Sequence, residues 1–172
     1  ELSGRTLGIL GYGELGQAVA RLAEAFGMRV LVGALPGRER EGRPALEHFL
    51  PAIDVLSLHC PLTEATRDLI GAPELALMKP GSLVINAGRG GLVNEAALAA
   101  ALRFGHLGGA ACDVLTVEPP VDGNPLLDAD LPNLVITPHS AWGSREARQR
   151  IVGQLSENAQ AFFNGTPMRV VS

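Results

Sequence analysis

The alternation of short apolar runs with segments of helical periodicity is the feature that most constrains the fold of this chain. Apolar runs of strand length recur six times between the two ends of the sequence. Parallel neighbours in a sheet need a long connection, so this alternation predicts βαβ crossover units and a parallel sheet. The predicted strands are Arg5–Leu10, Met28–Val32, Asp54–Leu58, Ser82–Asn86, Leu107–Asp113 and Leu134–Thr137.

The strand segments are near-continuous in apolar residues, a pattern typical of strands that are buried on both faces. We therefore expect an α/β fold, namely a Rossmann-type doubly wound parallel sheet in a single three-layer domain over residues 1–172. Ligands of such sheets bind beyond the carboxyl ends of the strands. Helices are predicted through Leu15, Val19, Leu22 and Phe26 up to Gly27, over Pro44–Leu50 and Pro73–Met78, from Asn94 to Gly105, and from Ser144 to about Asn164.

Composition excludes several classes of function. Hydrophobic residues make up 47% of the 172 residues, which is enough for a sizeable core and argues against a disordered tail. The net charge of −4 gives no general attraction to nucleic acid or anionic lipid. Five Phe, one Tyr and one Trp are too few for a base-stacking surface. We expect neither a nucleic-acid partner nor a membrane partner.

The chain also carries no targeting or metal-binding pattern. No apolar run approaches the roughly 20 residues of a membrane helix, and Glu1–Arg5 lacks the basic and apolar regions of a signal peptide. The two cysteines, Cys60 and Cys112, form neither a disulfide framework nor a metal knuckle. We interpret them as reduced, half-buried thiols, and we expect a cytoplasmic protein without a metal.

Gly11-Tyr12-Gly13-Glu14-Leu15-Gly16 follows the first predicted strand and opens the first helix. In this context the pattern predicts a dinucleotide-binding turn. Gly11 would permit the tight turn, Gly13 a close approach of the backbone to a pyrophosphate, and Gly16 close packing of helix on strand. The alternative is an ordinary glycine turn between a strand and a helix.

The second strand ends without the acid that grips the 2′-hydroxyl of the NAD ribose, because Ala34 occupies the expected place. Arg38 and Arg40 follow in the loop Leu35–Arg43, and either could meet a 2′-phosphate. The alternative is that both are surface charges. The missing acid predicts that NADP is tolerated or preferred.

Three ionisable residues stand just beyond predicted strand ends, and they are Arg89, Glu118 and His139. Taken singly, each has a structural explanation: a surface charge, a loop acid, and a histidine near a helix start. Together they share the ligand-binding edge of one sheet, which favours a catalytic group.

Five motifs follow one another along the chain: Gly11–Gly16, His59–Thr63 with Thr66, Asn86–Gly91, Asp113–Pro120, and Pro138-His139. The last three contain Arg89, Glu118 and His139. In this order and spacing they resemble the NAD(P)-binding domain of the D-isomer-specific 2-hydroxyacid dehydrogenases, and most closely the glyoxylate/hydroxypyruvate reductase branch. The resemblance implies hydride transfer between NAD(P)H and a small 2-keto or 2-hydroxy acid. His139 would supply the proton, Glu118 would orient the His139 ring, and Arg89 would bind the substrate.

The resemblance also implies a cofactor-binding set, in which Ala34 replaces an acid and Gly88 stands where alanine is usual. That set is Gly11, Gly13, Glu14, Leu15, Gly16, Ala34, Arg38, Cys60, Pro61, Ala87, Gly88, Arg89, Asp113, His139 and Ala141.

Family members carry a second, substrate-side domain that we expect to be absent from this chain. Alone, the chain should then have little or no activity. The family also implies a homodimer formed through this domain, and the single Trp142 is a candidate for contact with a neighbouring subunit. Two alternatives remain: a dinucleotide-sensing module of the corepressor type without turnover, and a methyltransferase with a similar glycine-rich turn.

Overall fold

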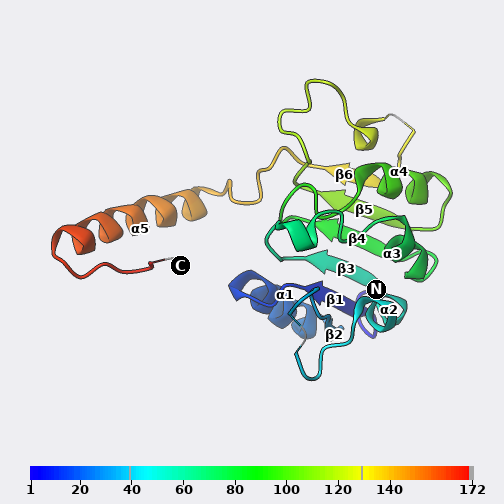
Figure 1. The fold of residues 1–172 in the computed structure, drawn as a ribbon, viewed down its shortest axis with the longest axis horizontal. Coiled ribbons are helices and arrows are strands. Elements are labelled where there is room, and N and C mark those ends of the chain that lie inside the picture. The colour runs from blue at the N-terminus through cyan, green and yellow to red at the C-terminus, as the bar shows by residue number, and fades with distance from the viewer. Residues whose placement is uncertain (39, 129, 171–172) are drawn as a thin grey trace. The chain divides into compact units, whose positions relative to one another are not determined.

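The computed structural model describes residues 1–38, 40–128 and 130–170, and it contains a six-stranded sheet in which every pair of neighbours is parallel (Figure 1). The strand order is β2-β1-β3-β4-β5-β6. The strands are β1 (Thr6–Leu10), β2 (Arg29–Val32), β3 (Val55–Leu58), β4 (Leu83–Asn86), β5 (Gly109–Cys112) and β6 (Leu134–Ile136). All six predicted strands are confirmed, and the α/β Rossmann-type class with them.

The predicted helices are also confirmed, with small shifts of their ends. They are α1 (Glu14–Ala25), α2 (Leu46–Phe49), α3 (Ala72–Leu77), α4 (Glu95–Arg103) and α5 (Arg145–Phe163). Asn94, where the fourth helix was predicted to start, caps α4, since its side-chain oxygen accepts a hydrogen bond from the Ala97 amide at 3.0 Å. The segment predicted as Pro44–Leu50 starts later and continues as a 3-10 turn over Leu50–Ala52.

The chain divides into two compact units, residues 1–138 and residues 139–172. The first unit contains the sheet and helices α1 to α4, and the second contains α5. Ser144 caps α5 by accepting a hydrogen bond from the Ala147 amide at 3.1 Å, and no residue of α5 is buried. That residues 1–172 form one dinucleotide-binding domain stays a prediction.

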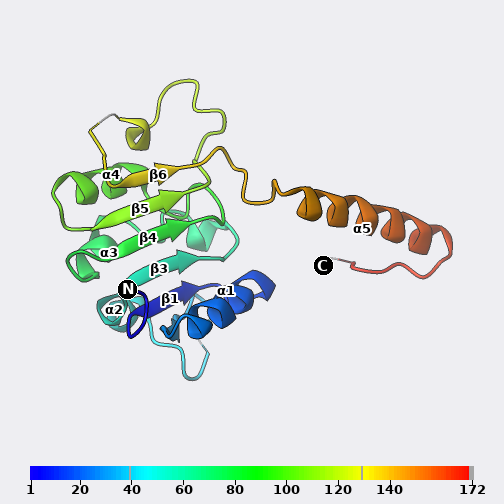
Figure 2. The ribbon, with the colours of Figure 1, turned by 180° about the vertical axis from the view of Figure 1, so that it is seen from behind.

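The strand order creates a switch point between β1 and β3. The chain leaves β1 for β2 on one side and then returns across β1 to place β3 on the other side (Figures 1 and 2). The connections that follow these two strands therefore diverge, and a crevice opens at their carboxyl ends. Gly11 and His59, which directly follow β1 and β3, stand at this point.

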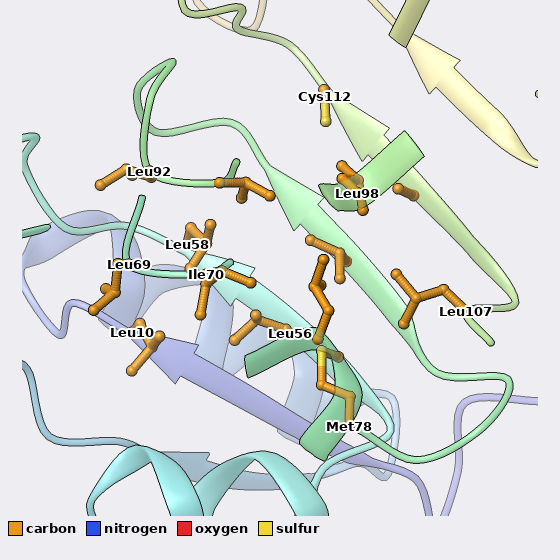
Figure 3. Packing of buried hydrophobic residues seen from close by; sticks show 14 of the residues in the cluster. Leu10, Leu56, Leu58, Leu69, Ile70, Met78, Leu92, Leu98, Leu107 and Cys112 are labelled. Atoms are coloured by element: carbon orange, nitrogen blue, oxygen red, sulfur yellow. The ribbon is translucent and has the colours of Figure 1, made fainter. Parts of the chain in front are cut away.

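Alternate residues of the strands face two separate apolar clusters. Leu10, Leu56, Leu58 and Val84 pack with side chains of α2, α3 and α4 in the larger cluster, which includes Leu98 (Figure 3). On the opposite face, Leu7, Ile9 and Val55 pack with Ala20 and Ala23 of α1. Helices thus flank the sheet on both faces.

Helix α1 packs through its small residues, whereas its large apolar residues face outward. Gly16, Ala20 and Ala23 are buried, but the side chains of Leu22 and Phe26 are 62% and 64% exposed. The spacing of the large residues therefore predicted the helix correctly without identifying the face that packs on β1. Close approach of helix to strand leaves room only for small side chains at this contact.

Burial of strands on both faces is confirmed for β1 and β3 and is wrong for the edge strands. Residues of β2 and β6 are only partly buried or exposed, and Val135 is 60% exposed. An edge strand has a neighbour on one side only, so apolar composition alone does not guarantee full burial. In the described part of the chain, no helix has the length and apolar character needed to cross a membrane.

Candidate cofactor and active site

A pocket of about 300 Å³ lies at the switch point, and we call it the switch-point pocket. It is lined by Gly11, Tyr12, Gly13, Leu35, Arg38, Arg40, Arg43, His59 and Pro61. Four residues of the predicted cofactor-binding set, Gly11, Gly13, Arg38 and Pro61, are thereby brought together. The segments after β1, β2 and β3 all contribute, as expected for ligand binding at a switch point.

The three glycines of the turn have distinct surroundings. Gly11 has a φ of +95°, and a Cβ atom there would lie 2.4 Å from the Cys60 amide nitrogen. A Cβ at Gly16 would lie 2.2 Å from the Gly11 carbonyl oxygen, so this glycine allows α1 to begin against the turn. At Gly13, by contrast, a Cβ would meet nothing within 4 Å.

This open position at Gly13 suits the approach of a ligand to the backbone. Gly13 is also the N-cap of α1, and no side chain caps the helix. The first amides of a helix lack partners within the helix and favour an anion such as a pyrophosphate. The turn therefore fits a dinucleotide. Glu14 and Leu15 occupy the first turn of α1 and are both exposed.

The polar lining of the pocket is cationic. Arg38, Arg40 and Arg43 line it, and none of its lining residues in the described part of the chain is an acid. The Arg43 guanidinium stacks over the Tyr12 ring with its carbon 5.7 Å from the ring centroid. The sequence indicated Arg38 and Arg40 but not Arg43, although Arg43 belongs to the same charged loop.

Ala34, at the position of the missing acid, is buried and does not line this pocket. Its amide donates a hydrogen bond to the Pro44 carbonyl at 2.9 Å, and it lines a neighbouring pocket with Leu35, Pro36 and Leu46. This backbone hydrogen bond holds the end of the loop Leu35–Arg43 against the end of β2. The role predicted for Ala34 itself stays a prediction.

The segment after β3 carries three residues with different environments. The Nε2 atom of His59 lies 2.9 Å from the Ser57 hydroxyl, and burial lowers the pKa of His59, which keeps the ring neutral at pH 7. Cys60 is a buried free thiol whose pKa is raised by burial. The Pro61 carbonyl accepts a hydrogen bond from the Thr66 hydroxyl at 2.8 Å, which fixes the turn.

Asn86, the last residue of β4, shapes the loop that presents Arg89. Its side-chain amide donates to the Arg89 carbonyl at 3.0 Å, and its side-chain oxygen accepts from the Gly88 amide at 3.1 Å. The Arg89 guanidinium is exposed and donates to the Gly88 carbonyl at 2.8 Å. Ala87 is exposed as well, so this loop offers a cation and backbone groups to solvent.

Glu118 and Asp113 follow β5 in one loop. A Glu118 carboxylate oxygen accepts a hydrogen bond from the Leu115 amide at 2.7 Å. The buried Asp113 accepts from the Thr137 hydroxyl at 2.5 Å, and its amide donates to the Asn86 carbonyl at 2.9 Å. The ends of β4 and β5 are therefore tied to each other.

The loops that carry Arg89 and Glu118 also touch. A Cβ on Gly90 would lie 1.9 Å from the Leu115 carbonyl oxygen, so only glycine allows the two backbones to approach this closely. The structure thus brings the Arg89 loop and the Glu118 loop together at one edge of the sheet.

His139 is the first residue of the second compact unit, whereas Arg89 and Glu118 belong to the first unit. Its φ is +50°, it is exposed, and its carbonyl accepts a hydrogen bond from the Trp142 indole nitrogen at 2.9 Å. The Trp142 ring is 54% exposed, and Ala141 is exposed too.

Cys112, like Cys60, is a free and buried thiol, more buried than the sequence suggested. Burial, with a smaller contribution from the charge of Glu95, raises the pKa of Cys112 to about 11, which makes it a poor nucleophile. Within the described residues, no group of three or more His, Cys, Asp or Glu side chains is placed to hold a metal ion.

Residues 1–141 match the family model described as "D-isomer specific 2-hydroxyacid dehydrogenase, NAD binding domain". The chain is 52% identical to the glycerate dehydrogenase of Methylorubrum extorquens over 171 residues, which cover 99% of the chain and 54% of that enzyme. It is 43% identical to the glyoxylate reductase of Aeropyrum pernix, covering 96% of the chain and 50% of that enzyme.

Among solved structures, the chain is similar to an acyclic imino acid reductase in complex with NADPH and D-Arg. The TM-score is 0.83 at 34% sequence identity, with 100% of this chain and 55% of the reductase covered. The chain thus spans about half the length of the curated relatives it matches.

These matches do not favour the corepressor and methyltransferase alternatives, because the relatives are named as dehydrogenases and reductases. With its glycine turn, its parallel sheet and a family match over residues 1–141, the chain belongs to the D-isomer-specific 2-hydroxyacid dehydrogenase family and contains the family's NAD-binding domain.

Proposed function

We propose that this chain binds NAD(P)H in the switch-point pocket and serves hydride transfer between that cofactor and a small 2-keto or 2-hydroxy acid, such as glyoxylate or hydroxypyruvate. The pocket itself is the observation that carries the proposal, since it joins the Gly11–Gly13 turn, the segment after β3 and three arginines. The names of the relatives support the substrate class. We also propose that the domain extends over residues 1–172 and acts with a substrate-side domain.

The proposed catalytic roles follow the chemistry of each side chain. The bound cofactor supplies the hydride. Arg89 holds the substrate carboxylate or keto oxygen, because a guanidinium is a planar and permanently charged donor. We assign the proton-donor role to His139 and the role of orienting its ring to Glu118, since an imidazole exchanges protons readily near neutral pH. Asp113 and the backbone at Ala87 and Gly88 would contact the nicotinamide end.

Water exclusion limits what this chain can do by itself. Hydride transfer needs a closed site, and closure in such enzymes comes from a second domain. We therefore expect the 172-residue chain alone to bind cofactor with little or no turnover. The two free thiols support a reducing compartment, and we propose the cytoplasm.

We expect NADPH to bind more tightly than NADH. The 2′-phosphate would meet the arginines of the pocket, and one charge-assisted hydrogen bond to a phosphate contributes about 1.5–3 kcal/mol, or roughly tenfold to a hundredfold in affinity. Calorimetric titration of the chain with each cofactor measures the difference. Arg38→Ala and Arg43→Ala should weaken NADPH binding and leave NADH binding nearly unchanged.

Arg21→Ala is the matched control, because Arg21 is exposed on α1 and does not line the pocket. Equal affinities for the two cofactors would overturn the NADPH preference and make the arginines surface charges. Failure of both cofactors to bind at millimolar concentration would overturn the cofactor site itself.

We further propose that the protein forms a homodimer through this domain. Leu15 and Leu22 of α1 form an exposed apolar stripe with Phe26, the C-cap residue of this helix, and such a stripe is typical of an interface. Leu22→Asp should shift the chain toward the 18.0 kDa monomer at micromolar concentration in sedimentation velocity. Phe104→Asp is the control, since Phe104 is 87% exposed beside a different helix. A wild-type monomer under these conditions would contradict the proposal.

A further inference from the structure

The segment that connects β5 to β6 carries Glu118. Side chains of α4 form hydrogen bonds with this segment at two places. At the start of α4, one Glu95 carboxylate oxygen accepts from the Thr116 amide at 2.7 Å and the other accepts from the Asn124 side-chain nitrogen at 2.8 Å. At the end of α4, Arg103 binds the carboxylates of Asp128 and Asp130.

Glu95 is directed at the loop and is not needed to cap its own helix. Asn94 already caps α4 by accepting from the Ala97 amide. The position of Glu95 is also fixed from behind, because Leu98, Ala99 and Leu102 of the same helix are buried in the larger core cluster. A carboxylate held in this way presents two acceptors in a defined place.

The contact of Glu95 lies next to the turn that holds the Glu118 carboxylate. Thr116, whose amide Glu95 binds, directly follows Leu115, whose amide donates to Glu118 at 2.7 Å. Gly90 also approaches this turn closely, since a Cβ there would overlap the Leu115 carbonyl. The turn is therefore in contact with both α4 and the Arg89 loop.

We propose that Glu95 is a positioning residue for Glu118: by binding Thr116 and Asn124 it sets the conformation of residues 115–118 in which the Glu118 carboxylate is presented. The inference rests on the proposed role of Glu118 in the reaction. Arg103 binds Asp128 and Asp130 at the other end of the same segment, and we assign it no role in positioning Glu118.

The orientation of the Asn124 amide makes a sharp test possible. The Asn124 side-chain oxygen accepts from the Leu126 amide at 2.9 Å, which directs the side-chain nitrogen at Glu95. Glu95→Gln would therefore set two amide nitrogens against each other, and Asn124→Asp would set two carboxylates against each other. The double variant Glu95→Gln/Asn124→Asp exchanges donor and acceptor and restores both contacts.

The 172-residue chain is measured by NMR without cofactor or substrate. We expect each single variant to speed hydrogen exchange of the Leu115 and Thr116 amides by at least about tenfold, the loss of roughly one hydrogen bond. The side-chain signals of Glu118 should move in both single variants and return to their wild-type positions in the double variant.

Arg103→Ala is the matched control, because it removes a charge from the other end of α4 and releases the same loop. It should move the side-chain signals of Asp128 and Asp130, which Arg103 binds, and leave the Glu118 signals in place. Glu118 signals that move equally in Arg103→Ala, or that stay in place in both single variants, would overturn the proposal. Cofactor binding is not part of this readout, so a failed cofactor titration and a failed positioning role are distinguished.

Discussion

Gly16→Ala is expected to destabilise the chain by about 2–3 kcal/mol, a large effect for one methyl group. The added carbon would lie 2.2 Å from the Gly11 carbonyl oxygen and 3.4 Å from Ile9. The first of these contacts is with backbone, so no side chain can rotate to relieve it. Either α1 moves away from β1 or the glycine turn opens. Urea unfolding followed by circular dichroism measures the loss.

Two other glycines serve as controls for this substitution. Gly153 also lies in a helix, but a Cβ there meets nothing within 4 Å, so Gly153→Ala should stabilise α5 by about 0.5–1 kcal/mol. Gly13→Ala should cost less than about 1 kcal/mol of stability and still weaken cofactor binding by about tenfold or more, because the methyl group occupies the open position at the turn.

The combination separates a folding role from a binding role. If the urea midpoint of unfolding is the same for Gly16→Ala and the wild type, the close packing of α1 on the turn does not require glycine at position 16. If Gly13→Ala binds NADPH as tightly as the wild type, the pyrophosphate does not approach the backbone at Gly13.

Gly90→Ala is expected to destabilise the chain by a similar amount, about 2–3 kcal/mol, and to displace the Glu118 loop. The new Cβ would lie 1.9 Å from the Leu115 carbonyl oxygen and 2.7 Å from the Thr116 amide nitrogen. The backbone of Gly90 itself does not require glycine, since its φ is outside the left-handed region. The cost therefore comes from the contact between the two loops.

Gly88→Ala is the control for Gly90, because it adds the same group to the same loop. A Cβ on Gly88 would lie 3.1 Å from the Leu58 carbonyl, a contact that a shift of a few tenths of an ångström relieves. We expect a cost below about 1 kcal/mol for this variant. Equal unfolding midpoints for the two variants would show that the Leu115 contact does not constrain the loop. Hydrogen exchange of the Leu115 and Thr116 amides reports the displacement directly.

Much of this site could be predicted because its determinants are local in the chain. The glycine turn needs only the spacing of Gly11, Gly13 and Gly16 between a strand and a helix. The places of Arg89 and Glu118 follow from strand ends, since parallel strands present their carboxyl ends at one edge. Predicting the strand segments was therefore sufficient to place these two residues at the same edge of the sheet.

Other features depend on which segments meet, and no local pattern carries that information. The helical period predicted α1, but packing against β1 selected its small residues and left Leu22 and Phe26 exposed. In the sequence, Arg43 is one of several charges in a polar loop. In the structure, the hydrogen bond from the Ala34 amide to the Pro44 carbonyl holds this loop at the end of β2, and Arg43 lines the switch-point pocket.

The sequence by itself determined the six strands, their parallel class, the dinucleotide turn and the edge at which Arg89 and Glu118 lie, because periodicity and glycine spacing act within a few residues. Only the tertiary structure decided that three arginines line one pocket, that Gly90 contacts Leu115, and that Glu95 binds a loop 21 residues away. Contacts between distant segments depend on the exact approach of packed elements, and the spacing of side chains along one segment does not specify that approach.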